Sequence, residues 1–189
     1  MEQIPKLDFE TLDTFFGSHA PFLISMSDGL QEELRLVIAA AEIGPVGGRI
    51  PEFHESDEAT RQALHEILAN TSPIEINEQC VYEICFHEYI LYQVRNESFC
   101  SYDSDEVGRG KYMVLFEKSK LLSSLSDITD AQQLEDGSFY PGKWVHYRIN
   151  TQCHIIDIIS HCPPRYHFLL WMRPKHKVDG LTMKFSYFV

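Results

Sequence analysis

The chain has 189 residues, 44% of them hydrophobic, and a formal net charge of −12. This length suits one domain with a substantial core, and the 12 Phe, 9 Tyr and 2 Trp argue against a disordered chain. No apolar run approaches the roughly 20 residues that cross a bilayer. The first residues lack the basic start and the apolar run of a secretory signal. We therefore expect a cytoplasmic protein that does not bind membranes.

The first 70 residues show mainly helical periodicity. A short helix is predicted from Asp8 to Phe16, ending at Gly17. A second helix is predicted around residues 30–41, because one helical stripe collects the apolar residues Leu30, Leu34, Val37, Ile38 and Ala41; Ser27 or Asp28 would cap its start and Gly44 would end it.

A third helix is predicted from about Ser56 to Ala69. Its inward face is expected to carry the apolar residues Ala63, Leu64, Ile67 and Leu68. The segment between the second and third helices, residues 44–53, is rich in Gly and Pro and predicts a loop.

From Gln79 onward the alternation of apolar and polar residues is typical of strands. In the first of these, Cys80, Tyr82, Ile84 and Phe86 share one face and Glu83 lies on the other. Strands are predicted within residues 79–86, 89–103, 111–117, 144–150, 153–160, 166–172 and 181–189, with a short helix or turn at 118–127. The turn residues Asp179 and Gly180 predict that the last two strands pair antiparallel.

Helices followed by strands predict a single α+β domain over residues 1–189. Residues 1–70 would be mainly helical and residues 75–189 mainly strands. The N-terminal helices would pack on a largely antiparallel β-sheet.

The stretch CHIIDIISHC, residues 153–162, combines potential metal ligands with four isoleucines. In a strand, Cys153 and His154 point to opposite faces and cannot easily share an ion, and the same holds for His161 and Cys162 unless the following prolines bend the chain. Five scattered cysteines without CxxC spacing indicate reduced thiols in a cytoplasm. We therefore predict a buried strand, with no metal site and no cofactor.

Asp157 lies in an otherwise apolar strand and must find a partner, for which Arg148 or Arg95 is expected in a structural ion pair. An enzymatic alternative stays open. A small hydrolase or transferase could use Asp157 with His154, or a Cys/His pair formed by one of Cys80, Cys85 and Cys100 with one of His87, His146 and His154.

The negative charge is concentrated in one part of the chain. Residues 1–110 carry 21 Asp and Glu against 6 Lys and Arg, a net of −15, whereas residues 111–189 carry 7 against 10, a net of +3. Such a field repels nucleic acid and attracts basic proteins, although acids on exposed helices also serve solubility alone.

The order of several segments resembles small bacterial proteins that are encoded beside polymorphic toxins and act as their immunity partners. The resemblance covers about residues 90–164, and its residues are Val94 to Ser98, Gly110, Ser119 to Leu122, His146, Tyr147, Ile155 to Ser160 and Pro163. It implies a cytoplasmic, non-catalytic protein that binds and neutralises a cognate toxin, and an acidic inhibitor suits a basic toxin of the nuclease type.

Exposure and charge select the candidate partner-binding residues, because the resemblance assigns no binding role. They are Glu97, Tyr102, Asp103, Asp105 and Glu106. A third alternative is a regulatory module that forms a homodimer through an uncovered sheet edge.

Overall fold

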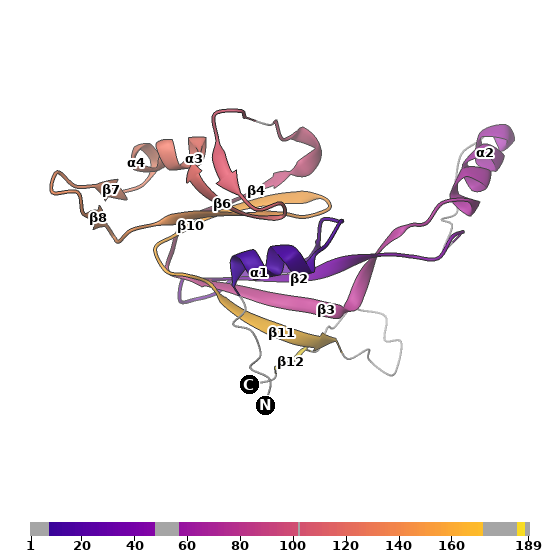
Figure 1. Cartoon of the computed structure of the whole chain (residues 1–189), viewed down its shortest axis with the longest axis horizontal. Coiled ribbons are helices and arrows are strands. Elements are labelled where there is room, and N and C mark those ends of the chain that lie inside the picture. The colour runs from indigo at the N-terminus through magenta and orange to yellow at the C-terminus, as the bar shows by residue number, and fades with distance from the viewer. Residues whose placement is uncertain (1–7, 48–56, 102, 172–184, 188–189) are drawn as a thin grey trace.

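The computed structural model describes residues 8–47, 57–101, 103–171 and 185–187. Within these ranges the fold is α+β, and its strands form two five-stranded sheets and a small two-stranded one (Figure 1). Every strand pair is antiparallel.

The first sheet, called sheet A, is formed by the first and last strands of the chain. Its spatial order is β1 (Phe22–Asp28), β2 (Glu33–Ile43), β3 (Ile74–His87), β11 (Arg165–Trp171) and β12 (Phe185–Tyr187). Sheet B has the order β4 (Tyr89–Asn96), β10 (His154–Ser160), β9 (Val145–Asn150), β6 (Met113–Lys118) and β5 (Val107–Arg109). The small sheet pairs β7 (Gln132–Gln133) with β8 (Phe139–Tyr140).

The main core lies between sheets A and B. Alternate residues of β2 and β3 meet alternate residues of β9 and β10, as the period of two in a strand requires. The short helix α1 (Phe9–Phe15) lies beside the sheets in Figure 1, and Phe9, Leu12 and Phe16 belong to the same buried cluster. Asp8 caps α1 by accepting a hydrogen bond from the Thr11 N–H.

α1 is fixed to sheet B by a single carboxylate. Asp13 accepts hydrogen bonds from the backbone N–H groups of Lys111, Tyr112 and Met113, at 2.7, 2.6 and 2.8 Å. Lys111 and Tyr112 precede β6 and Met113 is its first residue, so Asp13 joins segments about 100 residues apart in the chain.

The outer face of sheet B is covered at one end by the short helices α3 (Lys120–Ser123) and α4 (Leu125–Ile128) (Figure 1). Leu125 and Ala131 pack there on Ile159 of β10. A 3₁₀ turn, η1 (Glu97–Phe99), follows β4.

A two-stranded arm projects from the edge of the molecule (Figure 1). It consists of the ends of β2 and β3, residues 41–43 and 74–76, and of helix α2 (Glu58–Ala69). Asp57 caps α2 by accepting from Ala59 and Thr60 N–H, and no residue of α2 is buried. The prediction of this helix is confirmed, but its apolar residues do not face a core within the described structure.

The arm leaves sheet A at a bulge in β3. Ala39 pairs with Val81 and Ala41 with Ile76, so β2 advances by two residues where β3 advances by five. The three extra residues of β3 bend the pair of strands, as bulges do.

The predicted helix over residues 30–41 is wrong, because this segment forms the end of the β1–β2 turn and most of β2. Leu34, Leu36 and Ile38 face the main core, while Val37 and Ala39 pack on the opposite face against Val81 and Leu169. A strand buried on both faces shows no alternation, so its apolar run also fits a helical stripe.

Most other predicted elements are confirmed, including α1 and the strands near residues 80–86, 111–117, 144–150, 153–160 and 166–172. The last two strands do pair antiparallel, although the predicted turn at Asp179 and Gly180 lies outside the described residues. Among the residues that the structure describes, the helices are few and do not form an N-terminal layer on a single sheet.

None of the helices in the described ranges combines the length and the apolar character needed to cross a membrane.

Candidate functional site

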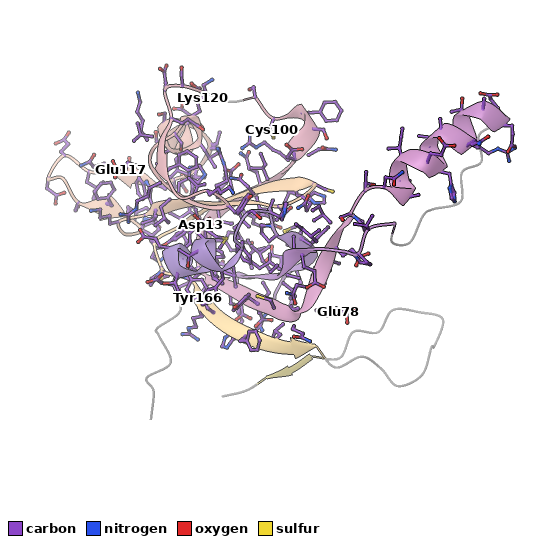
Figure 2. The ribbon with its side chains drawn as sticks, turned by 45° about the vertical axis from the view of Figure 1, so that its right-hand side comes forward. Asp13, Glu78, Cys100, Glu117, Lys120 and Tyr166 are labelled. Carbon is purple, nitrogen blue, oxygen red and sulfur yellow. The ribbon has the colours of Figure 1, made fainter. Side chains whose placement is uncertain are left out.

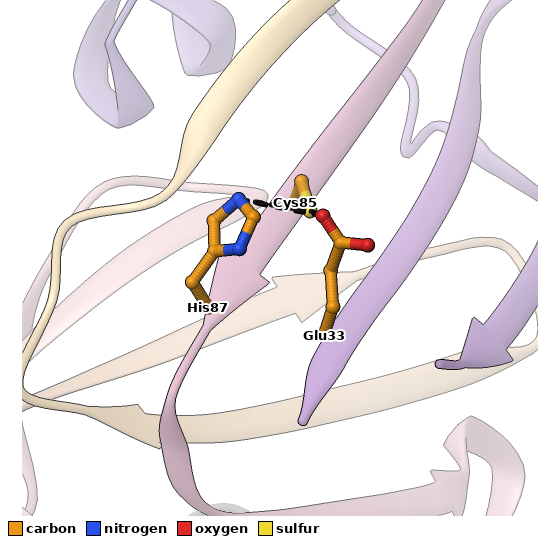
Figure 3. A group of neighbouring side chains, drawn as sticks. All are labelled: Glu33, Cys85 and His87. Carbon is orange, nitrogen blue, oxygen red and sulfur yellow. Dashed lines mark hydrogen bonds and ion pairs between the residues drawn. The ribbon is translucent and has the colours of Figure 1, made fainter. Parts of the chain in front are cut away.

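Three potential ligand side chains meet on the outer face of sheet A (Figure 3). Cys85 and His87 are two residues apart on β3 and therefore share a face, opposite to that of Ile84 and Phe86. Glu33 begins β2 and is the register partner of His87. The antiparallel pairing thus brings the three side chains together from positions 52 residues apart in the chain.

The three donor atoms form a compact triangle. The Cys85 Sγ lies 3.1 Å from the Glu33 Oε1 and 3.5 Å from the His87 Nε2, and this nitrogen lies 3.5 Å from the Glu33 Oε1. Cys85 is buried, whereas the side chains of Glu33 and His87 are 20% and 32% exposed. One side of the triangle is therefore open to solvent.

Arg35 orients the Glu33 carboxylate. Its Nε and one terminal nitrogen donate to the Glu33 Oε2 at 3.0 and 2.6 Å, which leaves Oε1 directed at Cys85 and His87. The other terminal nitrogen of Arg35 lies 3.4 Å from the buried Glu83. Hydrogen bonds from the Cys85 thiol and from Arg35 lower the pKa of Glu33, so this carboxylate is ionised at neutral pH.

The backbone next to this cluster has an uncommon conformation. Glu32 and Glu88, which neighbour Glu33 and His87 in the chain, have φ angles of 54° and 53°. Residues other than Gly rarely adopt this left-handed region, which costs about 1–2 kcal/mol per residue. The Glu88 N–H donates to the Glu32 carbonyl at 3.1 Å, so the two strained residues hold each other.

The Cys85–His87 pair is one of the Cys/His pairs that the sequence allows, but its geometry does not suit nucleophilic catalysis. A catalytic histidine places nucleophile and carboxylate at opposite ring nitrogens, whereas Cys85 and Glu33 both face Nε2. Burial and the hydrogen bond to Glu33 raise the pKa of Cys85 to about 12, so the reactive thiolate is scarce at neutral pH.

A second polar network lies on the outer face of sheet B around Asp157, whose carboxylate is completely buried. Its Oδ1 accepts from the His146 Nε2 at 2.9 Å and from the Arg148 Nε at 2.6 Å. Its Oδ2 accepts from Arg95 at 2.7 Å and from Gln93 at 3.0 Å. The predicted ion pair is confirmed, and both candidate arginines take part.

Burial alone would raise the pKa of Asp157, but the hydrogen bonds from His146 and Arg148 outweigh it and hold the pKa well below its usual value. Phe116 stacks on the His146 ring at 4.6 Å, and the Arg148 guanidinium lies 4.3 Å from the Phe116 centroid. The network is therefore packed as well as hydrogen-bonded.

Ser119, His146 and Asp157 form a chain that superficially looks catalytic. The Ser119 Oγ lies 2.8 Å from the His146 Nδ1, and Asp157 occupies Nε2. All three residues are buried, and the Ser119 Oγ also accepts the Leu122 N–H as the cap of α3. A serine that a substrate cannot reach, and whose oxygen caps a helix, has a structural role.

Residues 154–160 of this stretch form the strand β10, close to the predicted strand 153–160, with polar residues at its ends. Cys153 and His154 are exposed, and His154 does not approach Asp157, whose histidine partner is His146. Beyond β10 the chain brings His161 and Cys162 to the Glu88 carboxylate, at 3.3 and 3.7 Å. The adjacent residues His161 and Cys162 thus reach the same carboxylate, which is the exception stated above for a chain that bends near Pro163 and Pro164.

The predicted partner-binding residues have different environments. Glu97 and Asp105 are exposed, and Tyr102 lies outside the described residues. Asp103 forms an ion pair with Lys120 at 2.6 Å, and Glu106 pairs with Arg148 at 3.4 Å and accepts the Lys120 N–H. Two of the five positions thus form ion pairs that attach their loop to α3 and β9, and partner binding by this set stays a prediction.

The root of the arm contains a hollow of about 650 Å³ that sequence reasoning did not foresee. It is lined by the bulged segment of β3, residues 74–79, together with Phe22 and Glu42. Three carboxylates, those of Glu42, Glu75 and Glu78, are among its walls. Figure 2 shows Glu78 where the arm joins the sheet and the side chains of α2 beyond it.

Comparisons with models of known protein families, with curated proteins and with solved structures found no match.

Proposed function

We propose that this protein is a non-catalytic binding protein of the cytoplasm that neutralises a basic protein partner, as an immunity protein does with its toxin. The projecting arm is the observation that carries the proposal. The resemblance of residues 90–164 to toxin-immunity proteins gives the class of partner, and a nuclease-type toxin needs a positive surface to hold phosphate.

In the described part of the chain, the helix and the two-stranded ribbon of the arm lack the tertiary packing that usually stabilises such elements. A 12-residue helix is only marginally stable by itself in water, and so is a two-stranded ribbon. α2 has no buried residue, and Ile67 is 60% exposed on the same face as the partly covered Leu64 and Leu68. A partner that covers this stripe would supply the missing packing energy.

The charge of the arm selects a basic partner. The described segments of the arm, residues 41–43, 58–69 and 74–76, carry four Glu and one Arg, a net charge of −3. Within the described residues neither Glu42 nor Glu75 forms an ion pair, whereas carboxylates elsewhere pair with Arg109, Lys120 and Arg148. The hollow at the root of the arm offers carboxylates to a Lys or Arg side chain of the partner.

The two histidine-centred clusters support a role without catalysis. At His146 the nucleophile candidate is buried, and at His87 the thiol and the carboxylate compete for one ring nitrogen. Binding by an acidic arm needs neither cluster.

The test is co-expression with the protein encoded beside this gene, read as relief of growth arrest, followed by a measurement of affinity for that protein. Two substitutions perturb the arm: Ile67→Ser removes the exposed apolar side chain, and Glu75→Lys reverses a charge at the hollow. We expect each to weaken binding at least tenfold, which corresponds to 1.4 kcal/mol.

Two matched controls are available outside the arm. Ile128→Ser changes an isoleucine with 58% exposure, close to the 60% of Ile67, and Glu117→Lys reverses an exposed charge on β6. Both controls should bind as the unmodified protein does. Loss of rescue in the controls, or full rescue by both arm variants, would contradict binding through the arm, and failure of the unmodified protein to bind or rescue would refute the immunity role.

A further inference from the structure

We propose that Glu33, Cys85 and His87 form a binding site for Zn²⁺, with a water molecule as the fourth ligand. The site is distinct from the arm, because it lies at the opposite end of the same strand pair, where β2 begins and β3 ends.

The spacing of the three donor atoms fits tetrahedral zinc. Zinc binds sulfur at about 2.3 Å, nitrogen at about 2.0–2.1 Å and oxygen at about 2.0–2.2 Å. In a tetrahedral site these bond lengths place the sulfur about 3.6 Å from the nitrogen and from the oxygen, and the nitrogen about 3.4 Å from the oxygen. These distances between ligand atoms are the edges of the tetrahedron. The observed edges are 3.5 Å from Sγ to Nε2, 3.5 Å from Nε2 to Oε1 and 3.1 Å from Sγ to Oε1. Only the last edge must lengthen, by about half an ångström, once the hydrogen bond between thiol and carboxylate is replaced by the ion.

The donor types also select zinc. Thiolate, imidazole and carboxylate together suit a borderline ion, whereas Mg²⁺ and Ca²⁺ prefer oxygen ligands alone. Binding releases the Cys85 proton to water, so the thiolate and the Glu33 carboxylate balance the two positive charges of the ion. The partial exposure of Glu33 and His87 leaves the fourth position to water.

The surroundings hold the ligands in place before an ion arrives. Arg35 occupies the Glu33 Oε2 and leaves Oε1 for the ion, a role that outer partners of metal ligands commonly have. The left-handed residues Glu32 and Glu88 fix the neighbouring backbone through their mutual hydrogen bond. Strain of this kind is retained where the surrounding structure requires a particular geometry.

The second cluster, Glu88 with His161 and Cys162, provides an internal control. Its sulfur-to-oxygen distance of 3.7 Å also suits zinc, but its carboxylate is 65% exposed, against 20% for Glu33, so its ligands are held less firmly. It contains the same three ligand types, so it tests whether a signal comes from the proposed site or from any exposed thiol.

The experiment uses the full chain after treatment with a chelator and titrates it with Co²⁺, a spectroscopic substitute for Zn²⁺. We expect one equivalent to bind with thiolate-to-cobalt charge-transfer absorption, and Zn²⁺ to abolish this absorption by displacement. Cys85→Ser should remove the absorption, and Cys162→Ser should leave it unchanged. His87→Gln and Glu33→Gln should weaken binding at least tenfold, and Arg35→Gln, which removes only the orienting partner, by 10–100-fold.

Circular dichroism of each variant separates a lost ligand from a lost fold. Because Cys85 is buried, His87→Gln is the decisive variant if Cys85→Ser does not fold, since the His87 side chain is one-third exposed. Absence of thiolate absorption in the unmodified protein would overturn the proposal. It would also be overturned if folded Cys85→Ser kept the absorption, if Cys162→Ser lost it, or if His87→Gln bound with unchanged affinity.

Discussion

Replacing Asp157 by Asn tests the buried network of sheet B. Asn has the same shape as Asp but only one oxygen, so its NH₂ group must face donors at one of the two former oxygen positions. The Oδ1 side receives His146, which is fully buried, and Arg148, whose side chain is 16% exposed. The Oδ2 side receives Gln93 and Arg95, whose side chain is 35% exposed, so we expect the NH₂ group to turn to that side.

The magnitude follows from the bonds that are lost. Gln93 can reverse its amide and accept from the new NH₂, and Arg95 can reach solvent, so that side loses about one hydrogen bond. The other side keeps its bonds but loses the negative charge opposite Arg148. A hydrogen bond to a charged group contributes about 1.5–3 kcal/mol, and breaking a buried pair costs about 3–5 kcal/mol, so we expect Asp157→Asn to lower the free energy of unfolding by about 3 kcal/mol.

The effect should depend on pH in a defined direction. Because the pKa of Asp157 is lower in the folded than in the unfolded chain, its stabilisation is complete above the unfolded value of about 3.9 and is lost as the pH falls towards the folded value. Urea unfolding at neutral pH and at a series of acidic values should therefore give a difference between the two proteins that is constant above about pH 5 and shrinks below about pH 4.

The exposed Asp127→Asn is the matched control, and its stability should follow that of the unmodified protein at every pH. A loss below about 1 kcal/mol for Asp157→Asn, or a difference that does not shrink in acid, would refute the assignment of Asp157 as an ionised, fully bonded carboxylate.

Three further outcomes are expected. Asp13→Ala leaves three backbone N–H groups without their acceptor and should lower the free energy of unfolding, measured in urea, by about 2–3 kcal/mol. A decrease below about 1 kcal/mol would contradict the role of Asp13 in joining α1 to sheet B. Phe86→Ala empties a fully buried site against Tyr147 and should cost about 3–5 kcal/mol, whereas Phe86→Leu should cost clearly less if packing volume is the cause. In the native, metal-free protein the exposed Cys153 should react with a thiol reagent much faster than Cys85, because Cys85 is buried and its pKa is raised to about 12. Mass spectrometry of the labelled peptides measures both rates, and equal labelling would contradict the described burial of Cys85.

The strand β9 was predictable because its apolar residues Val145, Tyr147 and Ile149 alternate with the polar residues His146, Arg148 and Asn150. The first half was harder, since β2 is buried on both sides and its sequence therefore lacks the alternation that identifies a strand. Periodicity correctly indicated α2, but an apolar stripe does not reveal what covers it, and here the described structure provides no cover.

The ion pair of Asp157 could be predicted because an acid within an apolar strand needs a partner on a neighbouring strand, and Arg148 is its register partner on β9. The role of His146 was not predicted, because the pairing of strands decides which histidine is near. The Glu33 cluster escaped a search for spacings such as CxxC and HxxxH. Its local signal is Cys85-Phe86-His87, two ligand types at alternate positions of a strand, and its third member depends on the pairing of β2 with β3.

The bulge in β3 has a consequence for how this molecule could be altered. Residues 77–79 have no pairing partner on β2, so removing one of them would shorten the bulge and change the bend of the strand pair while leaving the register of β2 and β3 from Val81 onward intact. The orientation of the whole projection is thus encoded in a few residues of one strand. A change in their number would turn the helix and its carboxylates to another direction, without any substitution in the hydrophobic interior.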